Sequence, residues 1–381
     1  MRALYLNPFS QEVSGPDESL RTLLGALIPR GVEAHVAIPA EGPQIPRYEA
    51  LGARVHVIPM APLRRDLSLA AAAYPARLLR AAAGVASLAR RIDADLIHTN
   101  MEILLEGALA AKWLRRPHVM HYRGNTLDQP KIVFDGLAAT WSWGADAIYC
   151  ISNATAEVFR RRGHGGKVEV LYNPIDLAAF RAAPRSDAMR ARLGAAPTDR
   201  LVGTVARVHP RKDLETFVRA AAQVAGTTQN VHFAIVGAAE ADVEHAYRQT
   251  LDRLVSELGL QARVTFPGAI REIPSVMRAL DLFVLTSRHE GFGRVLAEAM
   301  AAGCPAVVTD EGALPELVQG GQAGRLAAPA DPGAFAAQIS ALLADPGLSA
   351  QLAGRATEVA RQFDVDVIAE RVWSRYQALT A

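Results

Sequence analysis

Short runs rich in Val, Ile and Leu alternate with longer segments of helical periodicity, and this alternation starts twice along the chain. It is typical of α/β proteins with doubly wound parallel sheets and helices on both faces. The strands predicted for the first half are Arg2–Leu6, Ala34–Ile38, Arg54–Ile58, Asp95–His98, Val119–His121, Ala147–Ile151 and Val168–Leu171. Those predicted for the second half are Leu201–Ala206, Val231–Val236, Arg263–Phe266, Leu282–Leu285 and Ala306–Val308.

The break between the two series divides the chain into two parts of similar size. It lies between Asn173–Asp176 and Pro197–Asp199. A chain of 381 residues is also too long for one ordinary hydrophobic core. We therefore predict a first domain at residues 1–177 and a second domain at residues 178–362.

The last segment of the chain has apolar residues at helical spacing. They are Val365, Ile368, Val372 and Tyr376. This pattern predicts a final helix within residues 363–381, which we expect to pack back on the first domain.

The composition excludes several classes of protein. The 41 basic and 39 acidic residues nearly balance, which argues against a nucleic-acid-binding protein. Half of the residues are apolar, which excludes disorder as the main state. Cys150 and Cys304 lie in no CxxC or Cys/His pattern, so we predict neither disulfides nor a zinc site. No apolar run has the roughly 18–20 residues of a membrane span, and we expect a soluble, cytoplasmic protein.

One basic segment leaves membrane contact open. Arg64 and Arg65 precede the Ala- and Leu-rich segment Leu67–Arg91. This segment fits either a helix on an anionic membrane surface or an ordinary amphipathic helix. The first interpretation predicts peripheral contact with the inner face of the membrane.

The segment Ser287–Met300 carries the strongest sign of a binding site. Ligands of open parallel sheets bind beyond the carboxyl ends of the strands, and this segment follows a predicted strand. It contains two glycines and then begins a helix, whose N-terminal amides would bind an anion. Glu290 in the loop and Glu298 on the helix would accept hydrogen bonds from two sets of hydroxyls. The alternatives are a solvated Glu290 and a Glu298 that only favours the helix dipole.

Two further strand ends carry candidate residues. Arg207 and Lys212 follow the strand Leu201–Ala206 and together suit a diphosphate. Only four of the 41 basic residues are lysines, which makes Lys212 more informative; a solvated basic loop capped by Asp213 is the alternative. His121 ends another predicted strand and would contact a sugar hydroxyl or a phosphate, although a lone histidine is more often packed or a cap.

Other catalytic motifs are missing from the sequence. It contains no GxGxxG, Walker A, HExxH or GxSxG pattern. The spacing of Asp93 and Asp95 is that of a metal-binding DxD, but Asp95 begins a predicted strand instead of ending one. We therefore predict no metal site.

These residues resemble the retaining glycosyltransferases of family four (glycosyl transferases group 1), which have the GT-B fold. The resemblance rests on Glu290-x7-Glu298 and on Arg207 with Lys212 in the context Ala-Arg-Val-His-Pro-Arg-Lys-Asp. The segments around Asn173–Asp176, Ala302–Val307 and Gly312–Val318 also match. It covers nearly all of the second half and is looser in the first half. It implies two Rossmann-like domains that face a central cleft.

The resemblance implies roles for individual residues. Arg207 and Lys212 match the pair that binds the donor diphosphate, Glu290 the acid at the donor sugar, and Glu298 the acid at the ribose. His121 matches the strand-end histidine at the donor sugar. The other donor-binding positions implied are Gly291, Phe292, Gly293, Arg294, Val295, Gly268, Ile270 and, on the first-domain loop, Gly15. Two positions depart from the family: Ser14-Gly15 replaces a Gly-Gly pair, and Pro174 replaces the hinge glycine.

The implied reaction moves a sugar from a nucleotide-diphosphate sugar to a hydroxyl, with retention, by front-face attack and without a metal or other cofactor. A UDP-sugar is favoured over a GDP-sugar. The acceptor would be a glycan, a lipid-linked acceptor or a small metabolite, bound by the first domain, and the second domain would bind the donor. The alternatives are a sugar-nucleotide epimerase of the same fold, a phosphorylase and a non-catalytic sugar-nucleotide-binding protein.

Overall fold

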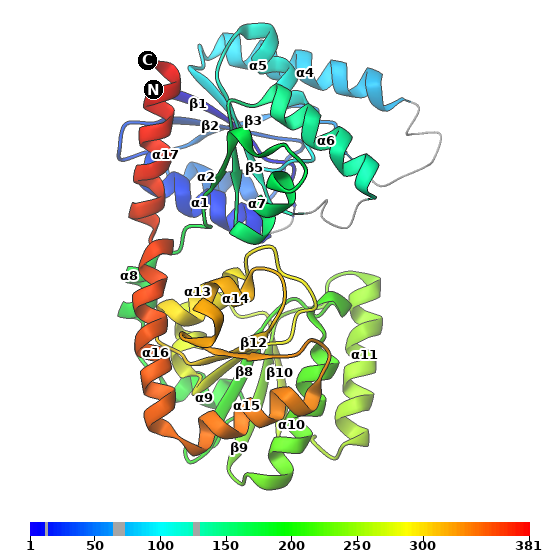
Figure 1. The fold of residues 1–381 in the computed structure, drawn as a ribbon, viewed down its shortest axis with the longest axis vertical. Helices are drawn as coiled ribbons and strands as arrows, with labels where there is room; N and C mark the ends of the chain where they lie inside the picture. The colour runs from blue at the N-terminus through cyan, green and yellow to red at the C-terminus, as the bar shows by residue number, and fades with distance from the viewer. Residues whose placement is uncertain (12–13, 64–72, 125–129) are drawn as a thin grey trace. The chain divides into compact units, whose positions relative to one another are not determined.

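The computed structural model describes residues 1–11, 14–63, 73–124 and 130–381 (Figure 1). Its contacts divide the chain into two compact units, Met1–Pro174 with Val365–Ala381 and Ile175–Asp364. Residues 175–177, assigned above to the first domain, belong to the second unit. The reason is that the Ile175 amide donates to the Phe363 carbonyl at 2.8 Å, and Ile175 pairs with Asp364.

The first unit is built on a parallel sheet. Its described strands are ordered β3-β2-β1-β4-β5-β6-β7. In chain order they are β1 (Arg2–Leu6), β2 (Glu33–Ile38), β3 (Arg54–Val57), β4 (Leu96–Thr99), β5 (His118–Tyr122), β6 (Ala147–Cys150) and β7 (Val168–Val170). Successive residues face opposite sides, as in β1, where Ala3 and Tyr5 enter one core cluster and Leu4 and Leu6 another.

Helices cover both faces of this sheet. They are α1 (Gly15–Leu27), α2 (Gln44–Glu49), α4 (Tyr74–Arg91), α5 (Glu106–Leu114), α6 (Lys131–Gly144), α7 (Asn153–Arg160) and α17 (Val365–Thr380). The core on one face takes residues from α1, α2 and α17, and the core on the other takes residues from α4 to α7. Ile368, Val372 and Tyr376 of α17 are fully buried in the first of these cores, so the final helix packs on the first unit.

The second unit has a parallel sheet whose described strands are ordered β10-β9-β8-β11-β12-β13. They are β8 (Arg200–Val205), β9 (Val231–Val236), β10 (Val264–Gly268), β11 (Leu282–Leu285), β12 (Ala306–Thr309) and β13 (Arg325–Ala327). The strand β13 was not predicted, because three residues carry too little pattern. Its pairing with β12 imposes the extended conformation.

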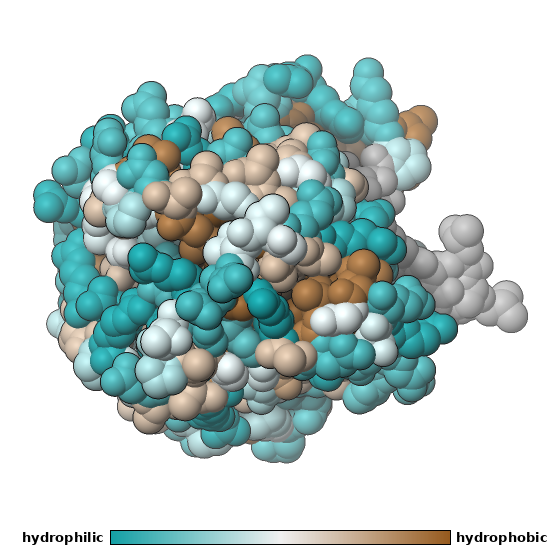
Figure 2. All heavy atoms as spheres, turned by 90° about the horizontal axis from the view of Figure 1, so that it is seen from below, coloured by the Kyte–Doolittle hydropathy of each residue, from teal (hydrophilic) through white to brown (hydrophobic). Residues whose placement is uncertain are grey.

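The helices of the second unit differ widely in length. They are α8 (Leu177–Ala182), α9 (Asp187–Arg192), α10 (Leu214–Thr227), α11 (Asp242–Glu257), α12 (Ile273–Ala279), α13 (Arg294–Ala301), α14 (Leu314–Leu317), α15 (Pro332–Ala344) and α16 (Pro346–Ala360). Phe217, Leu251 and Phe335 bury α10, α11 and α15 against the strands. Within the described ranges no helix is long and apolar enough to cross a bilayer. The face drawn in Figure 2 is mostly hydrophilic, with apolar side chains in small separate patches.

Histidines form a buried polar chain in the first unit. His98 on β4 bonds to the Tyr376 hydroxyl through Nδ1 and to Nδ1 of His121 through Nε2, at 2.7 Å in the second case. Tyr5 and Tyr149 lie around the same rings. Burial, and then the nearby Arg123 charge, hold the pKa of His98 and of His121 well below the usual value.

The low pKa values of His98 and His121 predict that acid destabilises the protein. Both histidines stay neutral when folded and gain protons when unfolded, so stability is present above the unfolded pKa near 6.5 and falls as the pH drops below it. Each histidine that is still neutral in the folded protein at pH 5 would lower the free energy of unfolding at that pH by about 2 kcal/mol. Urea unfolding at pH 7.5 and pH 5 should therefore give a smaller pH dependence for His98→Gln than for the unchanged chain. His164→Gln is the control, and an equal pH dependence in all three proteins would contradict the prediction.

Candidate functional site

Two neighbouring strand ends in the second unit bring Lys212 and Glu290 together. Lys212 ends the short 3₁₀ turn Pro210–Lys212 after β8, and Glu290 lies in the loop after β11. The Thr286 hydroxyl donates to the Lys212 carbonyl at 3.0 Å, which ties the two loops. The Lys212 ammonium then donates to Oε1 of Glu290 at 2.5 Å, with both side chains largely buried. The structure therefore joins a cation and an acid that stand far apart in the sequence.

Gly312, after the third strand end at β12, shapes the backbone around Glu290. Its φ of +65° favours glycine. A Cβ at this position would lie 2.6 Å from the Glu290 carbonyl oxygen, which accepts a hydrogen bond from the Ala313 amide at 3.0 Å. The close approach of these two backbones therefore requires glycine here.

Gly293 and Phe292 fix the start of α13. Gly293 is the N-cap residue with a φ of +87°, and a Cβ there would lie 2.6 Å from Leu314 Cδ2. The Phe292 ring is buried and lies perpendicular to the Phe363 ring, with 5.4 Å between their centroids. Because Phe363 lies close to the end of the second unit, this contact fastens the Glu290 loop to the last residues of that unit. Gly291, Arg294 and Val295 flank the same turn and are partly exposed.

Glu298 lies within α13 and is 7% exposed. Its Oε1 pairs with Arg294 Nε at 2.9 Å, one helical turn earlier. The carboxylate is thus held at the same helix end as Gly293. A helix-dipole role alone does not account for an acid buried so far into the helix, because the dipole acts mainly on the first turn.

Arg207 lies on the same loop as Lys212 but pairs with a different acid. Its Nε is 3.3 Å from Oε1 of Glu244, at the start of α11, and its side chain is 60% exposed. Burial raises the pKa of Glu244, but the Glu240 and Ala241 amides and the Arg207 charge outweigh that effect and lower it overall. The sequence analysis missed Glu244, because nothing in the residues around it indicates a contact with Arg207 in the loop after β8.

Asp213 does not cap the helix with its side chain, as the alternative of a solvated basic loop assumed. It precedes α10 with a φ of +46°, and its side chain accepts no helix amide. Instead it accepts from the Thr216 hydroxyl at 3.0 Å and pairs with Arg288 at 3.4 Å. The acid therefore links the two loops that carry Lys212 and Glu290.

Gly268 ends β10 at the edge of the sheet, and Ile270 follows two residues later. Gly268 has a φ of +79°, and no atom lies within 4 Å of the place where its Cβ would be. Its carbonyl accepts from the Gly237 amide at 3.0 Å, and Ile270 is buried. The space beside Gly268 is therefore open, whereas Ile270 packs inward.

Ser287 offers a polar atom that sequence reasoning did not single out. It is fully buried two residues after β11, and its hydroxyl has no hydrogen-bond partner within the described part of the chain. Buried hydroxyls usually have a partner, so this one suits a ligand or a water. Its position in the strand-end segment was the available signal.

His121 does not lie at a strand end as predicted. The strand β5 continues to Tyr122, and His121 faces the α17 side, where it is buried against His98. The first residue after the strand is Arg123. Its guanidinium is buried and donates to Oδ1 of Asn173 and of Asn100, each at 2.5 Å. Because the predicted strand ended one residue too early, His121 was selected as the strand-end residue and Arg123 was not made a candidate.

Gly15 begins α1 in an environment that is less suited to phosphate than the prediction requires. A Cβ at Gly15 would meet no atom within 4 Å, so neither packing nor backbone conformation demands glycine. However, Asp17 accepts from the Ser14 amide at 3.0 Å, and Asp17 and Glu18 make the first turn acidic. Negative charge at a helix N-terminus opposes a bound anion.

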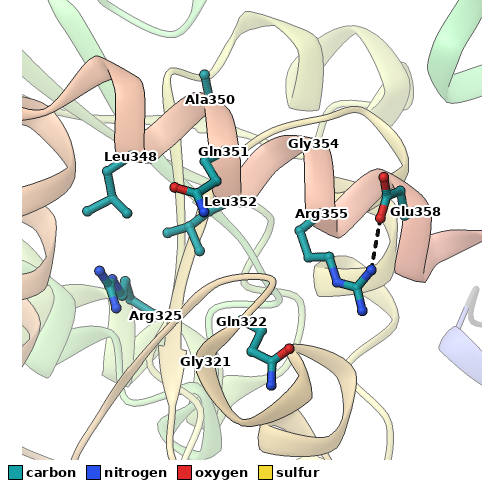
Figure 3. Close-up of a pocket in the computed structure, with 10 residues that line it drawn as sticks. All are labelled: Gly321, Gln322, Arg325, Leu348, Ala350, Gln351, Leu352, Gly354, Arg355 and Glu358. Carbon is teal, nitrogen blue, oxygen red and sulfur yellow. Dashed lines mark hydrogen bonds and ion pairs between the residues drawn. The ribbon is translucent and has the colours of Figure 1, made fainter.

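A pocket of about 620 Å³ lies elsewhere in the second unit, between α16 and the turn before β13 (Figure 3). None of its ten lining residues belongs to the predicted donor site. Arg355 points across it and pairs with Glu358 at 2.9 Å. In the described ranges no three His, Cys, Asp or Glu residues are grouped so that they could hold a metal ion.

Models of one enzyme family match both units. Residues 185–359 match "Glycosyl transferases group 1", and residues 13–179 match "Glycosyltransferase Family 4". This chain belongs to the group 1 glycosyltransferases of family four. Its two parallel-sheet α/β units are the two domains of the GT-B fold, as the resemblance predicted.

Among curated relatives, the chain is 36% identical over 184 residues to the D-inositol 3-phosphate glycosyltransferase of Mycolicibacterium gilvum. This match covers 48% of this chain and 40% of the relative. It is 33% identical over 214 residues to the lipopolysaccharide core biosynthesis mannosyltransferase LpsB of Rhizobium meliloti, covering 55% and 60%. The chain thus spans about half the length of the curated relatives that it matches.

Among solved structures, Anabaena HepE in complex with UDP is 27% identical to this chain. The TM-score is 0.85, and the match covers 99% of this chain and all of HepE. HepE has also been solved with UDP-glucose and with UDP and glucose.

Proposed function

We propose that this glycosyltransferase moves a sugar from a nucleotide-diphosphate sugar to a hydroxyl acceptor, with retention of the anomeric configuration. The observation that carries the proposal is the Lys212–Glu290 pair at two neighbouring strand ends, beside the glycine that begins α13. A cation for the leaving diphosphate and an acid for sugar hydroxyls meet at one point there. Ligands of open parallel sheets bind at such strand ends.

The proposed roles follow from these positions. Lys212 and Arg207 bind the diphosphate, Glu290 holds the transferred sugar, and Glu298 holds the ribose. The backbone from Gly291 to Val295 lies against the sugar and the phosphate, and Gly268 leaves room for the nucleotide. His121 and Gly15 keep weaker proposed roles, since the first is buried and the second has acidic neighbours.

The barrier to this reaction is departure of the diphosphate, which leaves positive charge on the sugar. Preorganised cations and amides stabilise the leaving charge without reorganisation during the reaction. The Lys212 ammonium already holds the Glu290 carboxylate. We therefore assign Glu290 a positioning and electrostatic role at the sugar, with front-face attack in which the leaving phosphate takes the proton of the acceptor hydroxyl.

A panel of nucleotide sugars tests the donor. HepE was solved with UDP-glucose, which favours a UDP-sugar over a GDP-sugar. The matching donor, at about 100 times its Kd, should raise Tm by roughly 5–10 °C. Absence of stabilisation by every UDP- and GDP-sugar would contradict the proposal. Stabilisation followed by an epimerised donor, with no transfer, would point to an epimerase, and binding with no reaction at all to a sugar-nucleotide-binding protein.

Activity should survive chelation. Lys212 and Arg207 supply positive charge where other sugar transferases would need a metal, and we expect full turnover in excess EDTA. The measurement is sugar transfer with and without EDTA on the same preparation. Loss on chelation and recovery with Mg²⁺ or Mn²⁺ would contradict the prediction.

We propose the chemical class of the acceptor. A glycan, a lipid-linked acceptor or a small metabolite carries the attacking hydroxyl, and the first unit binds it. The buried polar side chains that follow its strands, Arg123, Asn100 and Asn173, stand at the edge where such a ligand would bind.

A further inference from the structure

Helices α5 and α6, which pack against each other, expose large apolar side chains to solvent. Trp113 is 47% exposed, Trp143 is 55% exposed, and Ile132 is 83% exposed. On α6, Ile132, Gly136, Ala139 and Trp143 are exposed at the three- and four-residue spacing of one helical stripe. Such a stripe normally faces a core, and here it faces outward.

The two helices form one continuous surface. They lie side by side (Figure 1), and the Lys112 ammonium of α5 is 5.9 Å from the centroid of the Trp143 ring of α6. We define the α5–α6 surface as Lys112, Trp113, Lys131, Ile132, Val133 and Trp143.

The charge of this surface has one sign. Lys112 and Lys131 are exposed on it, and Arg115 and Arg116 are exposed just after α5. Of these, Arg116 pairs with the exposed Asp93 at 3.2 Å. The acids on the two helices are Glu106, which is buried, and Asp135, which is partly buried and pairs with Arg162 at 3.2 Å. The neighbouring α4 contains no acid and exposes Arg77, Arg80, Arg90 and Arg91. In a chain with a net charge of only +2, this is a local excess of positive charge.

We propose that the α5–α6 surface docks on an anionic lipid bilayer. Tryptophan is favoured at the boundary between lipid headgroups and acyl chains. Lysine extends its apolar stem into that boundary while its ammonium contacts anionic headgroups. The combination of exposed tryptophans, an aliphatic stripe and surrounding cations fits a lipid surface better than a protein, which would supply acids at fixed positions. The proposal is independent of the donor site and makes lipid-linked acceptors the first class to test.

This surface differs from the segment that the sequence marked for membrane contact. Arg64, Arg65 and residues 67–72 lie outside the described residues. The part of that segment in α4 buries Val85, Leu88 and Ala89 in the core. The exposed tryptophans, which no pattern around Arg64 indicated, come from the two following helices.

Co-sedimentation of the full chain with lipid vesicles tests the proposal. Vesicles of phosphatidylcholine with about 30 mol% phosphatidylglycerol should bind the chain, and phosphatidylcholine alone should bind it much less. Lys112→Gln/Lys131→Gln should lower the partition coefficient by roughly fivefold for each lysine. Trp113→Ser/Trp143→Ser should lower it by at least about tenfold. Raising the salt concentration should weaken binding.

Val243→Ser/Val367→Ser is the matched control, since these side chains are 55% and 47% exposed on other helices. It should bind vesicles as the unchanged chain does. Brominated lipids should also quench the tryptophan fluorescence of the unchanged chain, a readout that needs no variant. Failure of the unchanged chain to bind anionic vesicles would overturn the proposal. The proposal would also be overturned if the control variant lost as much vesicle binding as the tryptophan variant. It would be overturned as well if the tryptophan substitutions changed only the oligomeric state and not vesicle binding.

Discussion

Lys212→Ala is expected to lower kcat/KM for sugar transfer by about 10²–10³-fold, the usual cost of removing one preorganised group that stabilises developing charge. The ammonium is fixed before the donor binds, because Thr286 holds its backbone and Glu290 its side chain. Affinity for free UDP should fall too, since the diphosphate loses a counter-charge. Steady-state kinetics and calorimetry with UDP measure both effects.

Arg211→Ala is the matched control for this prediction. Arg211 is the preceding residue of the same short turn and is exposed, and its backbone contact to Arg288 does not need its side chain. We expect this variant to keep wild-type kinetics and UDP affinity. A folded Lys212→Ala protein that also keeps both would remove Lys212 from the diphosphate site.

Glu290→Gln and Glu298→Gln are expected to separate turnover from nucleotide binding. If Glu290 contacts hydroxyls whose hydrogen bonds strengthen as charge develops on the sugar, Glu290→Gln should lower kcat by about 10²-fold. Its affinity for UDP should change little, because UDP carries no sugar. If Glu298 holds the ribose equally in the ground and transition states, Glu298→Gln should weaken UDP and donor alike, by about tenfold or more.

Calorimetric titration of UDP into both variants, beside donor kinetics, measures this separation. Glu311→Gln is the control, because Glu311 is half-exposed. Its ion pair within the described residues is a long contact of 3.8 Å to His289, in the same loop as Glu290. The reverse pattern would exchange the two roles. Unchanged binding and turnover in both variants would leave Glu290 only a partner of Lys212 and Glu298 only a partner of Arg294.

Most of the secondary structure could be predicted because its signal is local. Every strand predicted from an apolar run is present, with ends that differ by at most two residues. Parallel strands buried on both faces carry dense Val, Ile and Leu, and the following helices carry an apolar stripe. The short helices α2, α8, α12 and α14 and the strand β13 were not predicted, because four to seven residues, or three in β13, contain too little period.

The candidate site was predictable wherever the residue types and their order carried the chemistry. The strand-end rule with two glycines and two acids selected Glu290 and Glu298, and the scarcity of lysine selected Lys212. The rule failed at His121 because a one-residue error in a strand end turns a side chain to the other face of the sheet.

The sequence by itself determined the two α/β sheets, the break between them and the segments that carry acids and cations, because each depends on patterns within a few residues. Only the tertiary structure decided which of these groups meet. It joined Lys212 to Glu290, Arg207 to Glu244 and Phe292 to Phe363, pairs separated by tens of residues. It also left Trp113 and Trp143 in solvent, where an apolar pattern predicts a core. Contact and exposure depend on how strands and helices stack, and that stacking is set by the packing of the whole unit.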